Sequence, residues 1–440
     1  MKAIKKFSND ALKQGGITSV WLFSRLQVVI ADPILAEVVL KNCLEKDDLL
    51  DILKIFTGGG SIFAPVKIWR SRRRKIVRVF NVRNLKEFVK IIGRQSDVMV
   101  NQLRSLTSSG SISIVKYLKK ASLCTVYEIA LGIQIRSQED SIIKAIGKCI
   151  RKTCFLLFRP PLQYEFLCLR TAITVLLKQK TREVNNNNTV KCGYLSNNDK
   201  QDLVEKNPTV VDILMKPNYA GMLSNVELCE EILVMIFAGT ETMSIALSLV
   251  CVMLSKYPDE QEQVYQEIKE VFGDTNKQPT TVDLQRLKYL EALIKETLRL
   301  YPPGPIIMRK TDKDIILPSG IKLVKGCGVV ISAWGIHRNP DYWGSDVEKF
   351  RPDRFLDKPP THPASYLPFS YGPRNCVGQQ YSLLSMKTTL STLLRYYRIL
   401  PEGARVSESQ NAVKDEQQLR VKYNVILNHV DNYVVELVAR

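Results

Sequence analysis

The chain has 440 residues, of which 45% are hydrophobic and 24% charged, a balance that is typical of a globular protein and excludes large-scale disorder. The formal net charge of +19 allows nucleic acid, an anionic membrane or acidic proteins as partners. The sequence has no helix-turn-helix, zinc-finger or RNA-binding motif, so we expect no nucleic-acid partner.

The cysteines and the N-terminus indicate in which cellular compartment the protein folds and whether it spans a membrane. None of the ten cysteines forms a CxxC pair, which argues against a structural zinc site and favours a reducing compartment. Residues 1–20 contain no apolar run long enough for a signal peptide or a membrane span, and we expect none later in the chain. The sequence therefore predicts a protein without a transmembrane segment.

The first part of the chain changes from strand to helix. Residues 18–31 are rich in β-branched and aromatic side chains, and they end at the turn signal Asp32-Pro33. Pro33 then begins a segment with helical periodicity. From about residue 67 to about residue 300, apolar side chains recur at helical spacing. This long region predicts a mainly helical body.

The C-terminal part carries short strands and turns. Hairpins are predicted around Ser319-Gly320 and Lys325-Gly326, and a final hairpin is predicted in residues 424–440. Between them, apolar side chains at helical spacing predict a helix that starts directly after Cys376. The whole pattern predicts a fold that is mainly α with small β portions (α+β).

The stretch PFSYGPRNCVGQQ, residues 368–380, places Cys376 between a turn and the start of that helix. Unpaired N–H groups and the helix dipole stabilise a thiolate at such a position. Gly372 permits a backbone conformation that other residues avoid, Gly378 lets a flat partner approach, and Arg374 can neutralise an anion. These features suit a thiolate that holds a planar, anionic, metal-bearing ligand, and haem with its two propionates fits.

The complete pattern is more specific than Cys376 alone, for which a buried cysteine at a helix start would be the favoured interpretation. The order F-x-x-G-x-R-x-C-x-G is matched by Phe369, Gly372, Arg374, Cys376 and Gly378. It resembles the cysteine loop of the cytochrome P450 family, the haem-thiolate monooxygenases. The resemblance covers roughly residues 18–440. It implies one large helical domain in which haem b lies between an oxygen-activating helix and the cysteine loop, with Cys376 as the axial ligand of the iron.

Two further segments agree with this resemblance. Glu296 and Arg299 match the family's E-x-x-R helix, and their spacing puts them on one helical face where they can pair. Residues 351–355, RPDRF, resemble the segment whose arginine, here Arg354, completes a Glu–Arg–Arg network behind the cysteine loop. The alternative for Glu296 and Arg299 is an ordinary surface ion pair, worth under about 1 kcal/mol.

The oxygen-activating helix is expected at residues 238–242, AGTET, which match the family pattern. The resemblance implies that Gly239 opens the helix groove for dioxygen and that Glu241 and Thr242 deliver protons. Met243 departs from the usual threonine or serine, which puts the detail of the proton relay in doubt. Standing alone, this segment would be interpreted as an amphipathic helix with two threonines.

Other cofactor contacts are carried over from the family. Trp69 and Arg73 resemble the pair that reaches the haem propionates, and Arg309 is expected to do the same from a strand. For each cation the alternative is a solvated side chain. His337 is interpreted as structural, and its position could lie near a propionate. No histidine is expected to bind the iron.

Apolar residues near these motifs predict a pocket for a lipophilic substrate, whether fatty acid, hydrocarbon, hormone or xenobiotic. The expected contacts are Ile62, Phe63, Phe237, Ala238, Ile306 and Ile307.

The segment HRNPDYWGSDVEKFRPDRF places the resemblance nearest to the animal microsomal clan that includes the fatty-acid ω-hydroxylases and many insect members. Some members of that clan carry an esterifying glutamate where Ala238 stands, so we expect no covalent haem link there. A membrane anchor and a proline-rich hinge are expected at the start of such proteins. We therefore interpret residues 1–20 as an atypical N-terminal segment of a truncated chain, followed by the catalytic domain at 21–440.

The resemblance implies oxygen insertion from O2, with electrons from NADPH through a reductase, possible support from cytochrome b5, and peripheral attachment to the cytosolic face of the endoplasmic reticulum. A basic run at residues 70–75 is a candidate reductase-docking surface through Arg72 and Arg74, against the alternative of a solvated face. Two rival functions stay open. One is a haem-thiolate isomerase that rearranges hydroperoxides, which an intact Thr242 disfavours. The other is a non-catalytic haem- or lipid-binding relative, which Met243 makes plausible.

Overall fold

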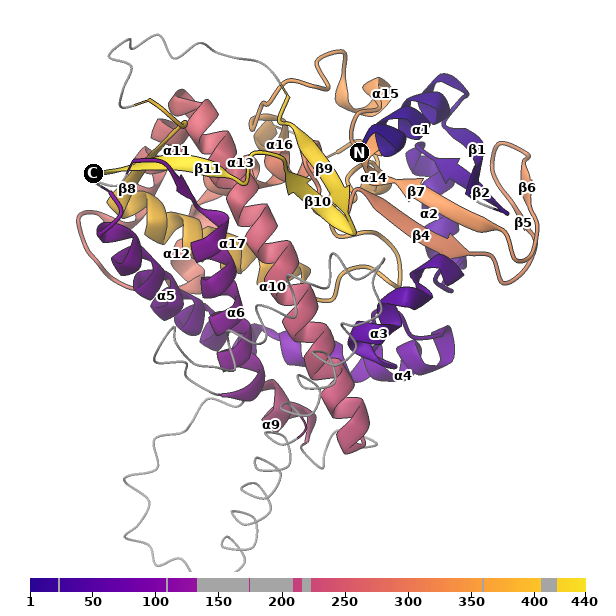
Figure 1. Cartoon of the computed structure of the whole chain (residues 1–440), viewed down its shortest axis with the longest axis horizontal. Coiled ribbons are helices and arrows are strands. Elements are labelled where there is room, and N and C mark those ends of the chain that lie inside the picture. Colours follow the sequence, from indigo (N-terminus) through magenta and orange to yellow (C-terminus); the bar gives the residue numbers. More distant parts are fainter. Residues whose placement is uncertain are drawn as a thin grey trace, which may run out of the picture. The chain divides into compact units, whose positions relative to one another are not determined.

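The computed structural model describes residues 1–22, 24–107, 110–132, 174, 209–215, 223–357, 360–404 and 418–440. The chain divides into two compact units, each built from separate stretches. The first unit contains Met1–Leu50, Val82–Thr125 and Gly239–Arg440, and the second contains Asp51–Asn81 and Val126–Ala238. Helices dominate and the sheets are small, as predicted (Figure 1). The assignment of residues 21–440 to one catalytic domain stays a prediction.

The helices of the first unit surround a large apolar core. The last helix, α17, packs against α5, α11, α12 and α13, and the core contains Met386, Leu390, Leu393 and Leu394 from its buried face. The helices of this unit are α1 (Lys2–Lys13), α2 (Pro33–Asn42), α5 (Val82–Arg104), α6 (Val115–Leu131, which ends in the second unit), α11 (Pro258–Phe272), α12 (Thr281–Arg286), α13 (Lys288–Leu300), α14 (Ala333–Ile336), α15 (Pro340–Trp343), α16 (Arg354–Asp357) and α17 (Gln379–Tyr396).

The strands of the first unit form four small sheets. The largest has the order β1-β2-β7-β4, the second the order β3-β11-β8, and the pairs β9–β10 and β5–β6 are separate. Their bounds are β1 (Ile17–Leu22), β2 (Arg25–Ile30), β3 (Ile112–Ser113), β4 (Ile306–Lys310), β5 (Ile315–Ile316), β6 (Lys322–Leu323), β7 (Gly328–Ser332), β8 (Tyr397–Leu400), β9 (Val421–Asn424), β10 (Ile426–His429) and β11 (Val434–Ala439).

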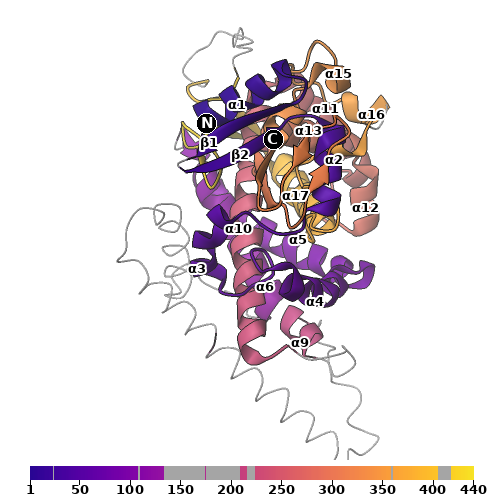
Figure 2. The same ribbon diagram turned by 90° about the vertical axis from the view of Figure 1, so that its right-hand side faces the viewer.

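The largest sheet is covered on both faces, because successive side chains of a strand alternate between faces. Val29 of β2 and its partner Val330 of β7 share an apolar cluster with Ala11 of α1. The next pair, Ile30 and Ile331, joins the cluster on α2. Figure 2 shows α1 lying across β1 and β2. This sheet positions β4, which carries several of the predicted site residues.

Two of the three predicted C-terminal hairpins differ from the structure. The hairpin around Ser319-Gly320 is confirmed, because β5 pairs antiparallel with β6. A turn lies at Lys325-Gly326, but the strand after it, β7, pairs with β2 and β4 and not with β6. The final hairpin is wrong: β10 pairs back with β9, whereas β11 joins β8 and β3. Tertiary pairing therefore overrides the local turn signals there.

The second unit contains α3 (Lys54–Thr57), α4 (Val66–Ile76), α9 (Val210–Leu214) and a 3₁₀ helix at Val77–Phe80. Another 3₁₀ helix, Asp48–Leu53, runs into it from the first unit. Thr209 begins α9 with a capping box, in which its hydroxyl accepts from the backbone of Asp212 and that carboxylate accepts from the backbone of Thr209.

The longest helix, α10 (Asn225–Lys256), starts in the second unit and continues into the first. Among the described helices it alone is long and apolar enough to cross a membrane, so the expectation that no stretch meets this requirement was too strict. Of its most apolar window, 72% is buried inside the protein, as in the core helix of a soluble protein. The helix is therefore weak evidence for a membrane span.

Candidate functional site

Backbone contacts hold the cysteine loop in one conformation. Cys376 lies two residues before Gly378, the N-cap of α17, and its N–H donates to the carbonyl of Phe369 at 2.8 Å. Gly372 has φ of +74°, and a Cβ there would lie 2.6 Å from the carbonyl oxygen of Leu40. Only glycine fits this position, since both the dihedral angle and the available space exclude a side chain.

The thiol of Cys376 is exposed at the N-terminal end of α17, which favours its thiolate form. A Cβ built at Gly378 would meet only the Cys376 sulfur, at 4.0 Å, among the described side chains and distant backbone. The face beside the sulfur therefore has room for a flat group. Phe369 is partly buried and packs against the core of the first unit.

Three cations of the first unit lie close enough to repel one another. We call Lys46, Arg309 and Arg374 the Arg309 cluster. Burial, aided by the charge of Arg374, lowers the pKa of Arg309 to about 10, and burial lowers the pKa of Arg374 to about 10. Burial and both arginines lower the pKa of Lys46 well below its usual value. The charge of Glu45 acts in the opposite direction on the pKa of Arg374. Such a cluster favours a bound anion.

Arg309 itself has capacity for further hydrogen bonds. It lies on β4 with its side chain fully buried, and Nη1 donates to the carbonyl of Met308 at 2.9 Å. Its Nε and Nη2 have no hydrogen-bond partner within the described part of the chain. A buried guanidinium with unsatisfied donors is costly unless a ligand accepts from it.

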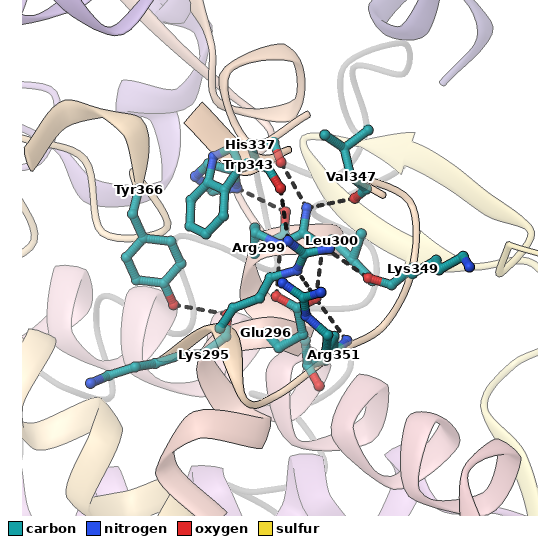
Figure 3. A network of polar contacts seen from close by, with 12 residues as sticks. Lys295, Glu296, Arg299, Leu300, His337, Trp343, Val347, Lys349, Arg351 and Tyr366 are labelled. Atoms are coloured by element: carbon teal, nitrogen blue, oxygen red, sulfur yellow. Dashed lines mark hydrogen bonds and ion pairs between the residues drawn. The ribbon is translucent and has the colours of Figure 1, made fainter. Parts of the chain in front are cut away.

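A second charged group is built on α13 around one carboxylate, that of Glu296 (Figure 3). Arg299 Nε and Nη2 each lie 2.7 Å from one carboxylate oxygen of Glu296, a bidentate pair with neither side chain exposed. Arg354 Nε lies 3.5 Å from Glu296 Oε1, and the backbone N–H of Arg351 donates to that oxygen at 3.0 Å. We call Glu296, Arg299 and Arg354 the Glu296 network.

The remaining donors of the Glu296 network bind the segment that follows α14. Arg299 donates to the carbonyls of His337, Val347 and Lys349, at 2.9, 2.7 and 3.2 Å. Arg354 Nη1 donates to the carbonyl of Trp343 at 2.7 Å, and Nη2 donates to Asp346. The E-x-x-R helix is thereby tied to residues 337–354.

Comparisons with known proteins agree with this geometry. A family model described as cytochrome P450 matches residues 2–423. The chain belongs to the cytochrome P450 family. It is 32% identical over 429 residues to cytochrome P450 4d2 of Drosophila melanogaster, covering 91% of this chain and 84% of that relative. It is 29% identical to cytochrome P450 4d8 of the same organism, over 93% of this chain and 94% of the relative. Cytochrome P450 4c21 of Blattella germanica is also 29% identical, over 86% and 79%.

Membership of the P450 family makes the chain a haem-thiolate monooxygenase in its general class, and its similarity to insect family-4 members confirms the resemblance noted in the sequence. The residues present fit the haem. Cys376 offers a sulfur at a helix N-terminus beside an open face, and the Arg309 cluster offers buried positive charge to two propionates.

His337 connects α13 to Leu367, the residue directly before the cysteine loop. Its Nδ1 lies 2.8 Å from the carbonyl of Arg299, and its Nε2 accepts from the N–H of Leu367 at 2.7 Å. The ring stacks on Tyr366, with centroids 5.5 Å apart. Burial lowers the pKa of His337 to about 3, so the ring is neutral. Both ring nitrogens bind backbone groups, which supports the structural interpretation, and a place near a propionate stays a prediction.

The residues of the oxygen-activating motif lie on one continuous helix, α10. Glu241 is buried and forms an ion pair with Lys119 of α6, a partner that the sequence did not indicate. Burial, with a contribution from the charge of Glu241, raises the pKa of Tyr433. Thr242 is partly buried, and Met243 is buried in the core of the first unit.

The remaining predicted contacts are divided between the two units. Trp69 and Arg73 lie on α4 of the second unit, Trp69 buried and Arg73 partly buried. The second unit also contains Ile62, Phe63, Phe237 and Ala238, whereas Ile306 and Ile307 lie on β4 of the first unit. Their roles stay predictions.

One residue of the candidate reductase-docking surface is not available for docking. Arg72 is only 5% exposed and pairs with Glu230 and Glu231 of α10, at 2.9 and 3.1 Å. Arg74, two residues later on α4, is exposed. The expectation that both arginines form a docking face is therefore wrong for Arg72, because the rotation of the helix turns it inward.

Proposed function

We propose that this P450 inserts one oxygen atom of O2 into a lipophilic substrate, with electrons from NADPH delivered through a reductase, and with Cys376 as the haem ligand. The observation that carries the proposal is the exposed Cys376 thiol at the N-terminus of α17, in the same unit as a buried cation cluster that calls for an anion. When bound, haem b supplies the activation of dioxygen.

The protein's own groups prepare the cofactor site. The N-terminus of α17 keeps Cys376 as a thiolate, and Gly378 leaves its flat approach open. Arg309 and Arg374 would bind the haem propionates, and the family resemblance assigns the same role to Trp69 and Arg73 of α4. The Glu296 network and His337 fix the segments behind the cysteine loop, so that the sulfur keeps its position.

Proton delivery is assigned to α10. Gly239 leaves room beside the helix for dioxygen, the Thr242 hydroxyl donates a hydrogen bond there, and Glu241 supplies protons to it. The ion pair with Lys119 supports this assignment, because it fixes the position of a buried carboxylate on α10.

The family resemblance assigns substrate contacts to apolar side chains: Ile62, Phe63, Phe237, Ala238, Ile306 and Ile307. A fatty acid, hydrocarbon, hormone or xenobiotic would suit such a lining. We place the enzyme on the cytosolic face of the endoplasmic reticulum membrane, with a reductase and cytochrome b5 as electron donors. The exposed Arg74 and its neighbour Arg70 remain for docking.

The test is turnover of the purified protein with an NADPH–P450 reductase and dodecanoic acid or hexadecane as probes. We expect NADPH consumption that rises with the probe and yields a hydroxylated product, and no product from Cys376→Ala. Turnover of a fatty-acid hydroperoxide without reductase would instead indicate the isomerase. Haem binding without turnover of any probe would indicate a non-catalytic relative.

A further inference from the structure

A glycine-rich loop in the second unit is bound to the first half of α10. We call residues 57–61, TGGGS, the glycine loop. The N–H of Gly59 donates to Glu230 Oε1 at 2.8 Å. The N–H and hydroxyl of Ser61 donate to the two oxygens of Glu231, at 2.8 and 2.7 Å. Two adjacent carboxylates of one helix thus hold the backbone of a loop about 170 residues away in sequence.

The loop approaches α10 so closely that no side chain fits between them. Gly58 has φ of +57°, and a Cβ there would lie 2.6 Å from Glu230 Oε1. A Cβ at Gly60 would lie 2.4 Å from a methyl carbon of Val234 and 2.9 Å from the carbonyl oxygen of Thr57. The glycines therefore serve close backbone approach to the helix, and they are not a sign of a loose linker.

Arg72 of α4 closes this arrangement from a third segment. Its Nη2 lies 2.9 Å from Glu230 Oε2 and its Nη1 lies 3.1 Å from Glu231 Oε1. The same Nη1 donates to the carbonyl of Gly59 at 2.7 Å. Glu227, at 3.5 Å from Nη2, adds a more exposed carboxylate. One guanidinium therefore binds both carboxylates and the loop that they hold.

This network is costly to bury. The side chains of Arg72 and Glu231 are 6% and 0% exposed, and burial raises the pKa of Glu231 despite its contacts with Ser61 and Arg72. Replacing such a buried network with apolar side chains is often neutral or stabilising, so its best-supported use is to specify one conformation. The conformation specified here is that of the glycine loop against α10.

We infer that Arg72, Glu230 and Glu231 form a latch that positions the glycine loop, and that the latch determines which lipophilic ligands the enzyme accepts. The loop leads directly into Ile62 and Phe63, and α10 continues from the latch into Phe237 and Ala238 within two turns. The inference rests on the proposed function, because these four residues are assigned to the substrate there. Arg72 acts through the loop and is a positioning residue with no contact to substrate assigned.

The first experiment compares Arg72→Met with Arg74→Met, the same change at an exposed position of the same helix. Hydrogen exchange followed by mass spectrometry reports on a peptide that covers residues 57–63. We expect exchange there to rise roughly tenfold in Arg72→Met, because the N–H groups of Gly59 and Ser61 lose a fixed acceptor, and to stay unchanged in Arg74→Met. Equal exchange in the two variants would overturn the latch.

The second experiment asks whether the latch governs ligand choice. Binding of 1-phenylimidazole and of imidazole is measured by the spectral shift of the haem. Both ligands need access to the iron, but only 1-phenylimidazole adds an apolar ring, so the ratio of the two dissociation constants reports on the apolar pocket alone. We expect Arg72→Met to weaken 1-phenylimidazole roughly tenfold with imidazole unchanged. Arg72→Lys, which keeps the charge, should restore part of the loss. An unchanged ratio would overturn the role in ligand choice.

Two further comparisons separate failure of the inference from simple unfolding of the variant and from failure of the proposed function. If Arg72→Met does not fold, Ser61→Ala removes only the hydroxyl contact with Glu231, and a rise in exchange of the same peptide is still required. If the wild-type protein binds no haem, the proposed function fails, whereas the exchange experiment still decides whether the latch exists.

Discussion

The first unit holds two groups of buried charges that differ in one respect. The Glu296 network joins two arginines to one carboxylate, and its other donors bind backbone carbonyls. The Arg309 cluster joins three cations, and two donors of Arg309 have no partner in the described part of the chain. Both groups are built on buried arginines, but only the Glu296 network contains a carboxylate that pairs with them.

The difference separates a structural group from a binding group. A network whose charges pair with one another stabilises the segments that it joins. Removing one partner leaves the remaining side chains with a buried charge that nothing compensates. A cluster of cations without enough partners lowers the stability of the ligand-free protein. The protein regains that stability when an anion binds to the cluster. The comparison therefore predicts opposite signs for substitutions in the two groups.

The largest effect is expected from Glu296→Gln. This change leaves Arg299 and Arg354 buried without a carboxylate and should lower the free energy of unfolding by about 3–5 kcal/mol, a large part of total stability. Urea unfolding followed by tryptophan fluorescence measures it. Glu87→Gln, which breaks an exposed pair with Lys90 on α5, is the control and should cost under about 1 kcal/mol. Similar costs for the two variants would contradict a structural role for the network.

The next effect concerns the pH dependence that His337 contributes. Because its folded pKa is about 3 and its unfolded pKa is near 6.5, the unfolded chain gains a proton that the native protein does not. The contribution of the neutral histidine to the free energy of unfolding should therefore be complete above pH 6.5. It should fall by about 1.4 kcal/mol per pH unit as the pH drops toward 3. His337→Asn should show a shallower fall in urea unfolding between pH 7 and 4. Parallel curves would show that the histidine is not buried in its neutral form.

A change of sign is expected from Arg309→Met. Without haem, loss of a buried unsatisfied cation should leave the free energy of unfolding unchanged or raise it by about 1–2 kcal/mol. With haem, loss of a charged hydrogen-bond donor should weaken retention about tenfold, measured as transfer to apomyoglobin. Lys310→Met is the control on the same strand, since Lys310 already pairs with Asp48 at 2.8 Å. Destabilisation of the haem-free protein would remove the distinction between the two groups.

The smallest effect is expected from Lys119→Met, which removes the partner of Glu241 without touching the cysteine loop. Product formed per NADPH consumed should fall by a factor of about three to ten, because the carboxylate is no longer held in one position. The haem spectrum should not change. Lys116→Met, at an exposed position of the same helix, should behave as wild type. Equal coupling in both variants would exclude Lys119 from proton delivery.

Local patterns predicted much of the fold. The strand character of residues 18–31 follows from their β-branched and aromatic side chains, although the sequence did not predict the hairpin that β1 and β2 form. The start of α2 at Pro33 and the helix after Cys376 follow from a turn signal and helical spacing. The three-residue spacing of Glu296 and Arg299 also indicated their pairing. The final hairpin was wrong although Asn432 and Tyr433 form a tight turn with positive φ, because β11 finds partners in β8 and β3.

Contacts between distant segments could not be predicted. Glu241 and Lys119 lie on different helices, as do Arg72 and the pair Glu230 and Glu231. No spacing rule connects them, and the basic run around Arg72 indicated an exposed face. The acidic residues on the apolar helix α10 were the one feature of the sequence that indicated such contacts, because a buried carboxylate requires a partner. The identity of that partner depends on the tertiary structure.

The most direct test of the account is the reduced, carbon-monoxide difference spectrum of the purified chain, recorded beside that of Cys376→Ser. The account predicts a strongly red-shifted Soret band for the wild type, as a thiolate-bound haem gives, and no such band for the variant. A wild-type band at the position of a neutral or histidine ligand, or no bound haem, would contradict the assignment of Cys376 as the iron ligand.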